Sequence, residues 1–578
     1  MAGILPTAFI WSVADLLRDN YKKSEYAKII LPFTVLRRLD CVLQAANSSA
    51  VKFNGFHMDY GLNPKSLLLD KGKEFTTQNI KSTFIELTKN SNELLVLRKL
   101  RAYIQSFNHE VQDIFEKFNF DSQIEHLQKI NLLYLIIEKF SLIDLHPDTV
   151  SNHMMGMIFE ELIRKFSELS NEISGEHFTP REVIRLMVSL LFIKDNEVTT
   201  REGIIRKLYD PTAGTGGMLS AAEEHLRSIN PSIQIMMCGQ EINSEAYAIC
   251  KADMLIKGQD IKNISLGNTL SNDQHCTQKY DYMLSNPPFG VEWRNAQEAV
   301  KAEHFSKGFT GRFGPGLPRI SDGSLLFLMH LISKMQPRCN GGSRIAIVLN
   351  GSPMFIGGAG SGESQIRRHI FENDLVEAII QLPEELFYNT SISTYIWIIT
   401  NKKSPDRTGK VQLIDASCFS TKLSKSLGKK RKTLEDFHIS KISEIFKSFK
   451  ETSQDGKSIC KILNNEDFGY RSITIDRPIN INGGKPIVTK QYKPKADRDL
   501  REIEILPLSE EIEKHLEQEV LPNHPDAWIE KSKTKIGYQV LFNRFFYKVK
   551  SHKSLKELDK EIKDLACSIA EITEDILQ

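Results

Sequence analysis

The spacing of apolar residues changes along the chain and divides it into three parts. Over residues 1–150, apolar side chains recur every three or four residues, as they do on one face of a helix. Tyr26 and Phe33 belong to one such series, and Ile130 and Leu133 belong to another. We therefore predict an all-helical N-terminal domain over these residues, and nothing in its sequence indicates chemistry.

Residues 151–480 begin with short apolar runs that alternate with helical patterns. Such alternation predicts a mainly parallel sheet with helices on its faces, so we expect an α/β domain with a Rossmann-like sheet. The runs that we expect to form strands are 204–209, 233–238, 261–266, 282–284, 344–349, 375–382 and 394–399.

The end of the chain carries a heptad pattern. Apolar residues lie at 555, 558, 562, 565, 569, 572 and 576, with Glu and Lys between them. This narrow apolar stripe predicts a coiled-coil-type helix. The helix could fold back on its own domain, but we favour pairing with a helix of another chain. Residues 481–578 are thus expected to form a C-terminal segment ending in a partner-docking helix.

Composition narrows the class of protein. The 578 residues are 41% hydrophobic and carry a formal net charge of only +2, so contact with nucleic acid must come from local patches. One patch comprises Lys425, Lys429, Lys430, Arg431 and Lys432. A nucleic-acid contact is one interpretation of it. We favour a solvated loop, because no aromatic residues lie between the charges.

The cysteines indicate a reducing compartment. The eight cysteines are scattered without a Cys-x-x-Cys pair, which is typical of a cytoplasmic protein and argues against structural zinc. We find no signal peptide and no apolar run long enough to span a bilayer. We therefore expect a cytoplasmic protein with no membrane partner and no metal site.

The first candidate for chemistry is Asn286-Pro287-Pro288-Phe289, which follows a predicted strand. Two prolines end the strand, because neither can donate to a ladder. Ligands bind at the carboxyl ends of strands in open α/β sheets. The Asn286 side-chain oxygen and the Pro287 carbonyl are acceptors, and Phe289 offers a flat face. Together they suit a planar group with an exocyclic amine, such as adenine, although a turn that merely caps the strand remains an alternative.

The second candidate is the glycine-rich turn Asp-Pro-Thr-Ala-Gly-Thr-Gly-Gly at residues 210–217. It follows a predicted strand and opens a predicted helix, so its glycines allow the backbone to approach a ligand closely. Glu241 ends the next predicted strand, where an acidic residue holds ribose hydroxyls. Asp210 suits a cationic amino-acid head, which points to S-adenosylmethionine rather than a dinucleotide. Asp210 could otherwise be a simple turn residue.

These two motifs, together with Gly175-x-x-Phe178-Thr179-Pro180, resemble the amino-methyltransferases that act on adenine N6. The fuller resemblance is to the modification subunit of type I restriction-modification systems. Segments 312–314, 321–327 and 350–353 share it, and it covers most of the chain.

This resemblance implies methylation of adenine N6 in duplex DNA with S-adenosylmethionine as cofactor. It also implies a C-terminal helix that docks on a specificity subunit, which reads the DNA sequence. A second modification subunit and an ATP-dependent restriction subunit are further expected partners. The expected catalytic residues are Asn286, Pro287, Pro288 and Phe289. The expected cofactor-binding residues are Glu176, His177, Phe178, Thr179, Pro180, Arg181, Asp210, Thr212, Gly214, Thr215, Gly216, Gly217, Glu241 and Asn268.

Three local features qualify this expectation. Asn268 stands where many adenine methyltransferases have Asp, and His177 replaces a commoner aromatic residue. The pair Thr179-Pro180 has the sequence of an N-cap and a first helical residue.

Other functions are compatible with parts of the sequence. Protein glutamine methyltransferases also use Asn-Pro-Pro with an aromatic residue, but the long flanking domains and the heptad tail favour the DNA enzyme. A non-catalytic scaffold with this fold would not need the glycines, Glu241 and Asn286. A stand-alone DNA methyltransferase would need a recognition domain, and we find none.

Overall fold

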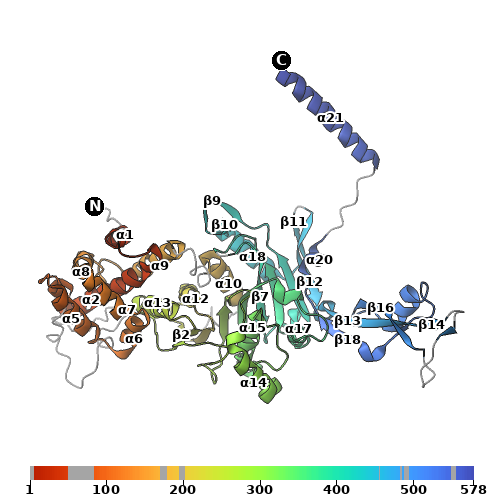
Figure 1. The fold of residues 1–578 in the computed structure, drawn as a ribbon, viewed down its shortest axis with the longest axis horizontal. Helices are drawn as coiled ribbons and strands as arrows, with labels where there is room; N and C mark the ends of the chain where they lie inside the picture. Colours follow the sequence, from red (N-terminus) through yellow and green to blue (C-terminus); the bar gives the residue numbers. More distant parts are fainter. Residues whose placement is uncertain are drawn as a thin grey trace.

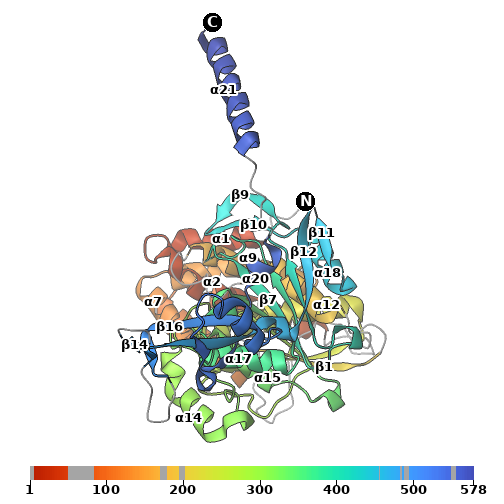
Figure 2. The same ribbon diagram turned by 90° about the vertical axis from the view of Figure 1, so that its right-hand side faces the viewer.

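The computed structural model describes residues 6–49, 84–169, 179–193, 202–388, 390–454, 456–481, 485–486, 494–547 and 555–577. The expected cofactor residues Glu176, His177 and Phe178 lie outside these ranges. Figure 1 shows a helical N-terminal part, a central sheet between helices and a smaller sheet beyond it. The C-terminal helix stands apart from the body in Figures 1 and 2.

The described part of the first 150 residues is helical, as predicted. Asn92 and Asn108 cap two of its helices, because their side chains accept hydrogen bonds from the backbone N–H groups of Leu95 and Val111. The helices are α1 (Pro6–Leu17), α2 (Ala27–Ser49), α4 (Phe84–Leu87), α5 (Glu93–Ile104), α6 (His109–Lys117), α7 (Phe120–Lys129) and α8 (Leu133–Ser141).

A ten-stranded sheet forms the centre of the chain and confirms the predicted α/β class. Its order is β11-β12-β8-β6-β7-β5-β4-β1-β2-β3. The strands from β3 to β5 are all parallel, and β7 is antiparallel to both of its neighbours. The strands are β1 (Ile205–Asp210), β2 (Gln234–Glu241), β3 (Ile264–Leu266), β4 (Tyr282–Ser285), β5 (Arg344–Asn350), β6 (Val376–Gln381), β7 (Thr394–Thr400), β8 (Lys410–Asp415), β11 (Thr452–Gln454) and β12 (Lys457–Asn464).

The strand order places a ligand-binding crevice beside β1. The chain runs from β1 through β2 to β3 on one side of β1, and β4 pairs with β1 on the other side. A parallel sheet opens a crevice at the carboxyl ends of its strands where the order reverses in this way. Both predicted motifs follow these strands directly, since Asp210 ends β1 and Asn286 follows β4.

Helices cover both faces of the sheet. Successive strand residues point to opposite faces, so Tyr282 and Leu284 of β4 join one core while Met283 joins the other. The first core includes residues of α10, α12, α13 and α18, and the second includes residues of α15 and α17. These and the remaining helices of this part are α9 (Asn152–Leu169), α10 (Arg181–Phe192), α12 (Gly217–Ile229), α13 (Ser244–Ile256), α14 (Gln297–Lys307), α15 (Ser324–Ser333), α16 (Ser352–Phe355), α17 (Gly362–Glu372) and α18 (Asp436–Ser448).

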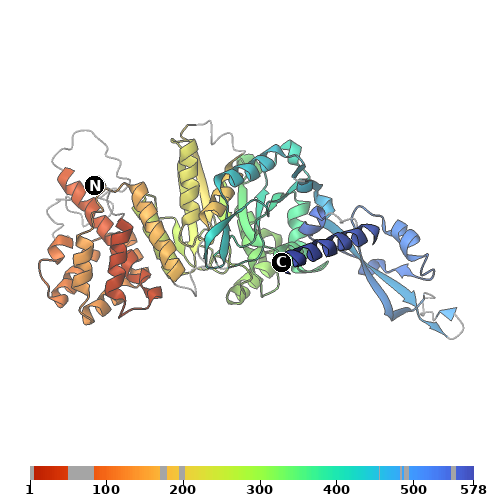
Figure 3. The ribbon, with the colours of Figure 1, turned by 90° about the horizontal axis from the view of Figure 1, so that it is seen from above.

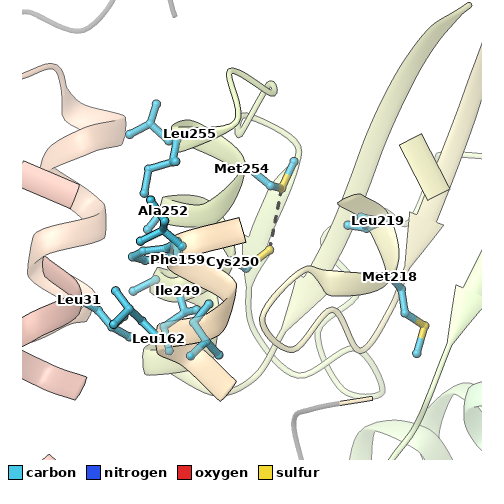
Figure 4. Close-up of a cluster of buried hydrophobic side chains, with 14 of the residues drawn as sticks. Leu31, Phe159, Leu162, Met218, Leu219, Ile249, Cys250, Ala252, Met254 and Leu255 are labelled. Carbon is cyan, nitrogen blue, oxygen red and sulfur yellow. Dashed lines mark hydrogen bonds between the residues drawn. The ribbon is translucent and has the colours of Figure 1, made fainter. Parts of the chain in front are cut away.

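The N-terminal helices pack directly on the sheet domain. Figure 4 shows Leu31 of α2 and Phe159 of α9 meeting Ile249 of α13 in one apolar cluster. A polar contact reinforces the junction, because Asp113 of α6 accepts a hydrogen bond of 2.7 Å from the Tyr247 hydroxyl. Lys251 of α13 lies 3.1 Å from the same carboxylate. The two parts therefore share one continuous core.

The C-terminal part forms a second, smaller sheet. Strand β13 (Gly469–Pro478) pairs with β16 (Ala496–Pro507), β17 (Trp528–Ile529) and β18 (Lys535–Tyr538), so this sheet spans the boundary that we place at residue 480. Figure 3 shows it extending from the central domain on the side away from the N-terminal helices. The remaining elements are β14 (Asn480–Ile481), β15 (Lys485–Pro486), α19 (Ile512–His515) and α20 (Phe542–Phe546).

The predicted heptad segment is the helix α21 (Leu555–Leu577). Five of its heptad residues are between 42% and 86% exposed, namely Leu555, Leu558, Ile562, Leu565 and Ile569. These five residues of the apolar stripe therefore face solvent rather than the body of their own chain.

The interpretation of the basic run as a solvated loop is wrong in its secondary structure and at Lys430, although Lys425, Lys429 and Arg431 are exposed. The basic run that we expected as a solvated loop belongs to a hairpin of β9 (Thr421–Leu427) and β10 (Lys430–Thr433). Lys430 is only 3% exposed and forms an ion pair with Glu182 of α10. A buried cation needs such a partner, and the sequence alone could not show it. Among the described residues, no helix is long and apolar enough to cross a bilayer.

Candidate active site

A cavity of about 260 Å³ lies at the carboxyl edge of the sheet, where the strand order reverses. Residues of both predicted motifs line it. The predicted residues on its wall are Thr179, Asp210, Thr212, Gly214, Thr215, Gly217, Glu241, Asn268, Asn286 and Pro288. The structure thus brings together around one cavity residues that are more than one hundred positions apart in the sequence.

Asp210 lines this cavity and is only 1% exposed. Its Oδ1 accepts hydrogen bonds from the Thr212 backbone N–H at 2.9 Å and the Thr212 hydroxyl at 3.2 Å. Burial nevertheless raises the pKa of Asp210 to about 7, because the charged form loses its hydration. A cation in the cavity would favour the ionised carboxylate, so this position is poised for a positively charged group.

The glycine turn has the backbone that its sequence predicts. Gly214 and Gly216 adopt φ angles of +54° and +81°, which residues other than glycine disfavour because of their Cβ atoms. A Cβ at Gly216 would lie 2.7 Å from the Cys250 sulfur of α13. The turn therefore packs tightly on α13 and leaves its backbone exposed to the cavity at Gly214, Thr215 and Gly217.

Glu241 lines the cavity directly beside the turn, at the end of β2. Its Oε2 accepts a hydrogen bond of 2.8 Å from the Gly214 N–H, and its Oε1 accepts one of 2.8 Å from Asn243. These bonds fix the carboxylate and leave each oxygen with further accepting capacity for ligand hydroxyls. Asn268 also lines the cavity, and its Oδ1 accepts a bond of 2.9 Å from the Leu270 N–H.

Asn286 is held by a residue that lies 107 positions earlier. Its side-chain Nδ2 donates to the Thr179 hydroxyl at 2.9 Å. Its Oδ1 is buried and has no hydrogen-bond partner among the described residues. A buried acceptor without a partner costs free energy, so this oxygen is prepared to accept from a ligand N–H.

This contact corrects the expected helix start. Thr179 does not cap α10, because Pro180 occupies the N-cap position and no side chain caps that end. The Thr179 hydroxyl accepts from Asn286 instead, which explains its position at the cavity wall.

The remaining expected residues lie around the cavity rather than on its wall. Pro287 is buried, and Phe289 packs edge-on against Phe387, with ring centroids 5.9 Å apart. Arg181 forms an ion pair with Glu160 of α9, and Glu160 lines the cavity. Besides Pro287, Phe289 and Arg181, two more expected residues, Pro180 and Gly216, do not line the cavity.

Several wall residues were not expected from the sequence. Segment 291–296 contributes Trp293, and α15 contributes Phe327. Arg312 supports the wall from behind, since it donates to the carbonyl oxygens of Thr269 and Leu270 at 2.8 and 2.9 Å and pairs with Glu303 at 2.7 Å. Only the family-like segments at 312–314 and 321–327 pointed to this region.

Comparison with known proteins identifies the family. Residues 150–479, which are 330 of the 578 residues, match the N-6 DNA methylases. The chain belongs to the N-6 DNA methylase family. Residues 7–140 of this methylase match the HsdM N-terminal domain.

Similar proteins agree with this assignment. The type I restriction enzyme MjaIX methylase subunit of Methanocaldococcus jannaschii is 25% identical over 528 residues, which cover 88% of each chain. The HindI methylase subunit of Haemophilus influenzae is 28% identical over 330 residues, covering 54% of this chain and 66% of that relative. The type I methyltransferase subunit structure from Streptococcus thermophilus superposes with a TM-score of 0.62 at 23% identity, covering 80% of this chain and 96% of that one.

The resemblance to type I modification subunits is confirmed. This methylase is an adenine-specific DNA methyltransferase, and its relatives place it as the modification subunit of a type I restriction-modification system.

Proposed function

We propose that this methylase transfers the methyl group of S-adenosylmethionine to adenine N6 in duplex DNA, within a complex in which a separate specificity subunit reads the sequence. The observation that carries the proposal is the unpartnered Asn286 Oδ1 on the wall of the cavity that the glycine turn and Glu241 also line.

The cavity suits the proposed cofactor. Asp210 is a buried carboxylate that a cationic amino-acid head would keep ionised, and Glu241 retains accepting capacity for ribose hydroxyls. The glycine turn leaves backbone open between them. S-adenosylmethionine, when bound, supplies an electrophilic methyl group on a positively charged sulfur.

Asn286 acts on the adenine amino group. The nitrogen lone pair is delocalised into the purine ring, which makes it a poor nucleophile. Asn286 Oδ1 and the Pro287 carbonyl accept hydrogen bonds from the two N–H groups of this amino group. These bonds draw the nitrogen toward tetrahedral geometry, which localises the lone pair. The Thr179 hydroxyl keeps Asn286 Oδ1 turned toward the amino group, since it binds the other end of the same amide. Catalysis is therefore mainly positioning and electrostatics.

The target base must leave the duplex to reach Asn286 and Pro287, at a cost of a few kcal/mol. Phe289 offers a stacking face, and stacking on an aromatic ring contributes about 1–3 kcal/mol. Phe387 fixes the Phe289 ring by its edge-on contact. The aromatic pair therefore offsets part of the cost of extruding the base.

Helix α21 is the proposed docking element for the specificity subunit. Five residues of its heptad stripe are exposed on a helix that stands apart from the body (Figure 2). Burying such a stripe against another helix is the ordinary way to stabilise it. We also propose a second modification subunit in the complex and an ATP-dependent restriction subunit as its cleaving partner.

The test is transfer of a labelled methyl group to duplex DNA, with and without the specificity subunit. Digestion of the product should give N6-methyladenine at defined sites in the complex. Label on a protein glutamine, or no transfer to any adenine-containing duplex, would contradict the proposal.

A further inference from the structure

The β9–β10 hairpin has no role in the site described above, yet it is anchored to the segments that contact Asn286 and Phe289. It follows β8, and β8 is parallel to β6, so the hairpin begins at the same carboxyl edge of the sheet as Asn286. Figure 1 shows it at the edge of the body, above α18 and α10.

One buried side chain, Lys430, anchors the hairpin through two contacts. The Lys430 ammonium pairs with Glu182, which lies three residues after the Thr179 that holds Asn286. It also donates to the Leu386 carbonyl at 3.0 Å, one residue before the Phe387 that contacts Phe289. The hairpin is thus tied to the two segments that position the catalytic asparagine and the stacking ring.

Backbone contacts add to these anchors. The N–H of Lys429 donates to the Tyr388 carbonyl at 2.9 Å, and the N–H of Arg431 donates to the Glu385 carbonyl at 2.9 Å. Gly428 has a φ of +61°, and a Cβ there would lie 2.7 Å from the Tyr388 oxygen. The turn of the hairpin is therefore seated closely on the loop after β6.

Several exposed residues of the hairpin are basic. Lys422, Lys425 and Lys429 are exposed, and their ammonium groups make no ion pair within the part of the chain that the structure describes. Lys432 stands directly opposite Lys422 in the β9–β10 ladder. Like charges in this position repel each other and destabilise a hairpin. An anion bound between the Lys422 and Lys432 ammonium groups would remove the cost of their repulsion.

We propose that the exposed lysines of the β9–β10 hairpin bind the DNA backbone beside the extruded adenine. The inference rests on the proposed function, since it requires DNA at this edge of the sheet. Phosphates fit the charge, and the buried Lys430 anchor fixes the distance between the phosphate contacts and the Asn286 corner. Such contacts position a duplex without reading its sequence.

The test is the salt dependence of DNA binding by the full-length chain. The hairpin variant replaces Lys422, Lys425 and Lys429 with Gln. Each lost phosphate contact reduces the slope of log affinity against log salt by about 0.9, so three contacts change it by about 2.7. Between 50 and 200 mM salt, wild-type affinity should therefore fall about 40-fold further than that of the variant. Fluorescence anisotropy with a short labelled duplex measures this difference.

A matched control replaces Lys262, Lys410 and Lys447 with Gln. These exposed lysines lie before β3, at the start of β8 and in the last turn of α18, and the net charge changes by the same amount. The control should retain the wild-type slope. Equal slopes for the hairpin variant and wild type would overturn the inference, as would an equal loss in the control. So would loss of binding to the specificity subunit with an unchanged slope, because the lysines would then contact protein.

The proposed function is tested separately in the same preparation. Wild-type methyl transfer to adenine at low salt shows whether the reaction is correct, whatever the slopes. Cofactor affinity should be the same in all three proteins, which also checks their folding.

Discussion

The hydrogen bond between Thr179 and Asn286 yields the sharpest prediction. Replacing Thr179 with Val keeps the shape of the side chain and removes the acceptor that Asn286 Nδ2 uses at 2.9 Å. Thr179 is 8% exposed, so water does not readily replace the hydroxyl. A buried polar group left without a partner costs about 1–3 kcal/mol. If this cost falls on the orientation of Asn286 in the transition state, the methyl-transfer rate falls about 5- to 150-fold.

The assay is single-turnover methylation with labelled cofactor, together with calorimetric titration of the cofactor. Thr179→Ser retains the hydroxyl and should keep the rate within about twofold, since the bond to Asn286 is preserved. The reasoning fails if Thr179→Val is as fast as Thr179→Ser. It also fails if cofactor affinity falls by the same factor as the rate, because Thr179 would then act on the cofactor and not through Asn286.

Three further predictions concern separate parts of the molecule. Because burial raises the pKa of Asp210 to about 7, affinity for a cationic cofactor should rise with pH up to about 7 and then level off; Asp210→Asn should abolish this dependence in calorimetric titrations. Gly216→Ala combines a φ of +81° with a 2.7 Å approach to Cys250, so denaturant unfolding should show a loss of about 2–4 kcal/mol. Gly203→Ala, with a φ of +64° and open space, should lose only about 1–2 kcal/mol, and equal losses would contradict the packing argument. Leu565→Asp on α21, where the side chain is 63% exposed, should leave thermal stability unchanged but prevent co-purification with the specificity subunit; retained co-purification would rule out this docking face.

The elements that the sequence predicted are those with local signals. Strand β1, the glycine turn and α12 form one continuous pattern, and the prolines after β4 mark the end of that strand without any tertiary information. Parallel strands place their carboxyl ends at one edge, so the proximity of Asp210, Glu241 and Asn286 also followed from the order of elements.

The elements that the sequence did not predict depend on contacts between distant residues. The Thr179–Asn286 bond joins positions 107 residues apart, and a threonine before a proline looks locally like a helix cap. Lys430 resembles its neighbours in the basic run, and only the packing of the hairpin on Glu182 distinguishes it. The support that Arg312 provides behind the cavity wall is invisible for the same reason.

The most direct test of the central claim is methyl transfer by Asn286→Ala, measured beside its cofactor affinity. The side chain interacts with the adenine amino group in our mechanism, while the glycine turn, Asp210 and Glu241 hold the cofactor. We predict that N6-methyladenine disappears from the digested DNA while the cofactor dissociation constant changes by less than about threefold, less than a single hydrogen bond would contribute. Full N6-methyladenine formation by Asn286→Ala would contradict the mechanism.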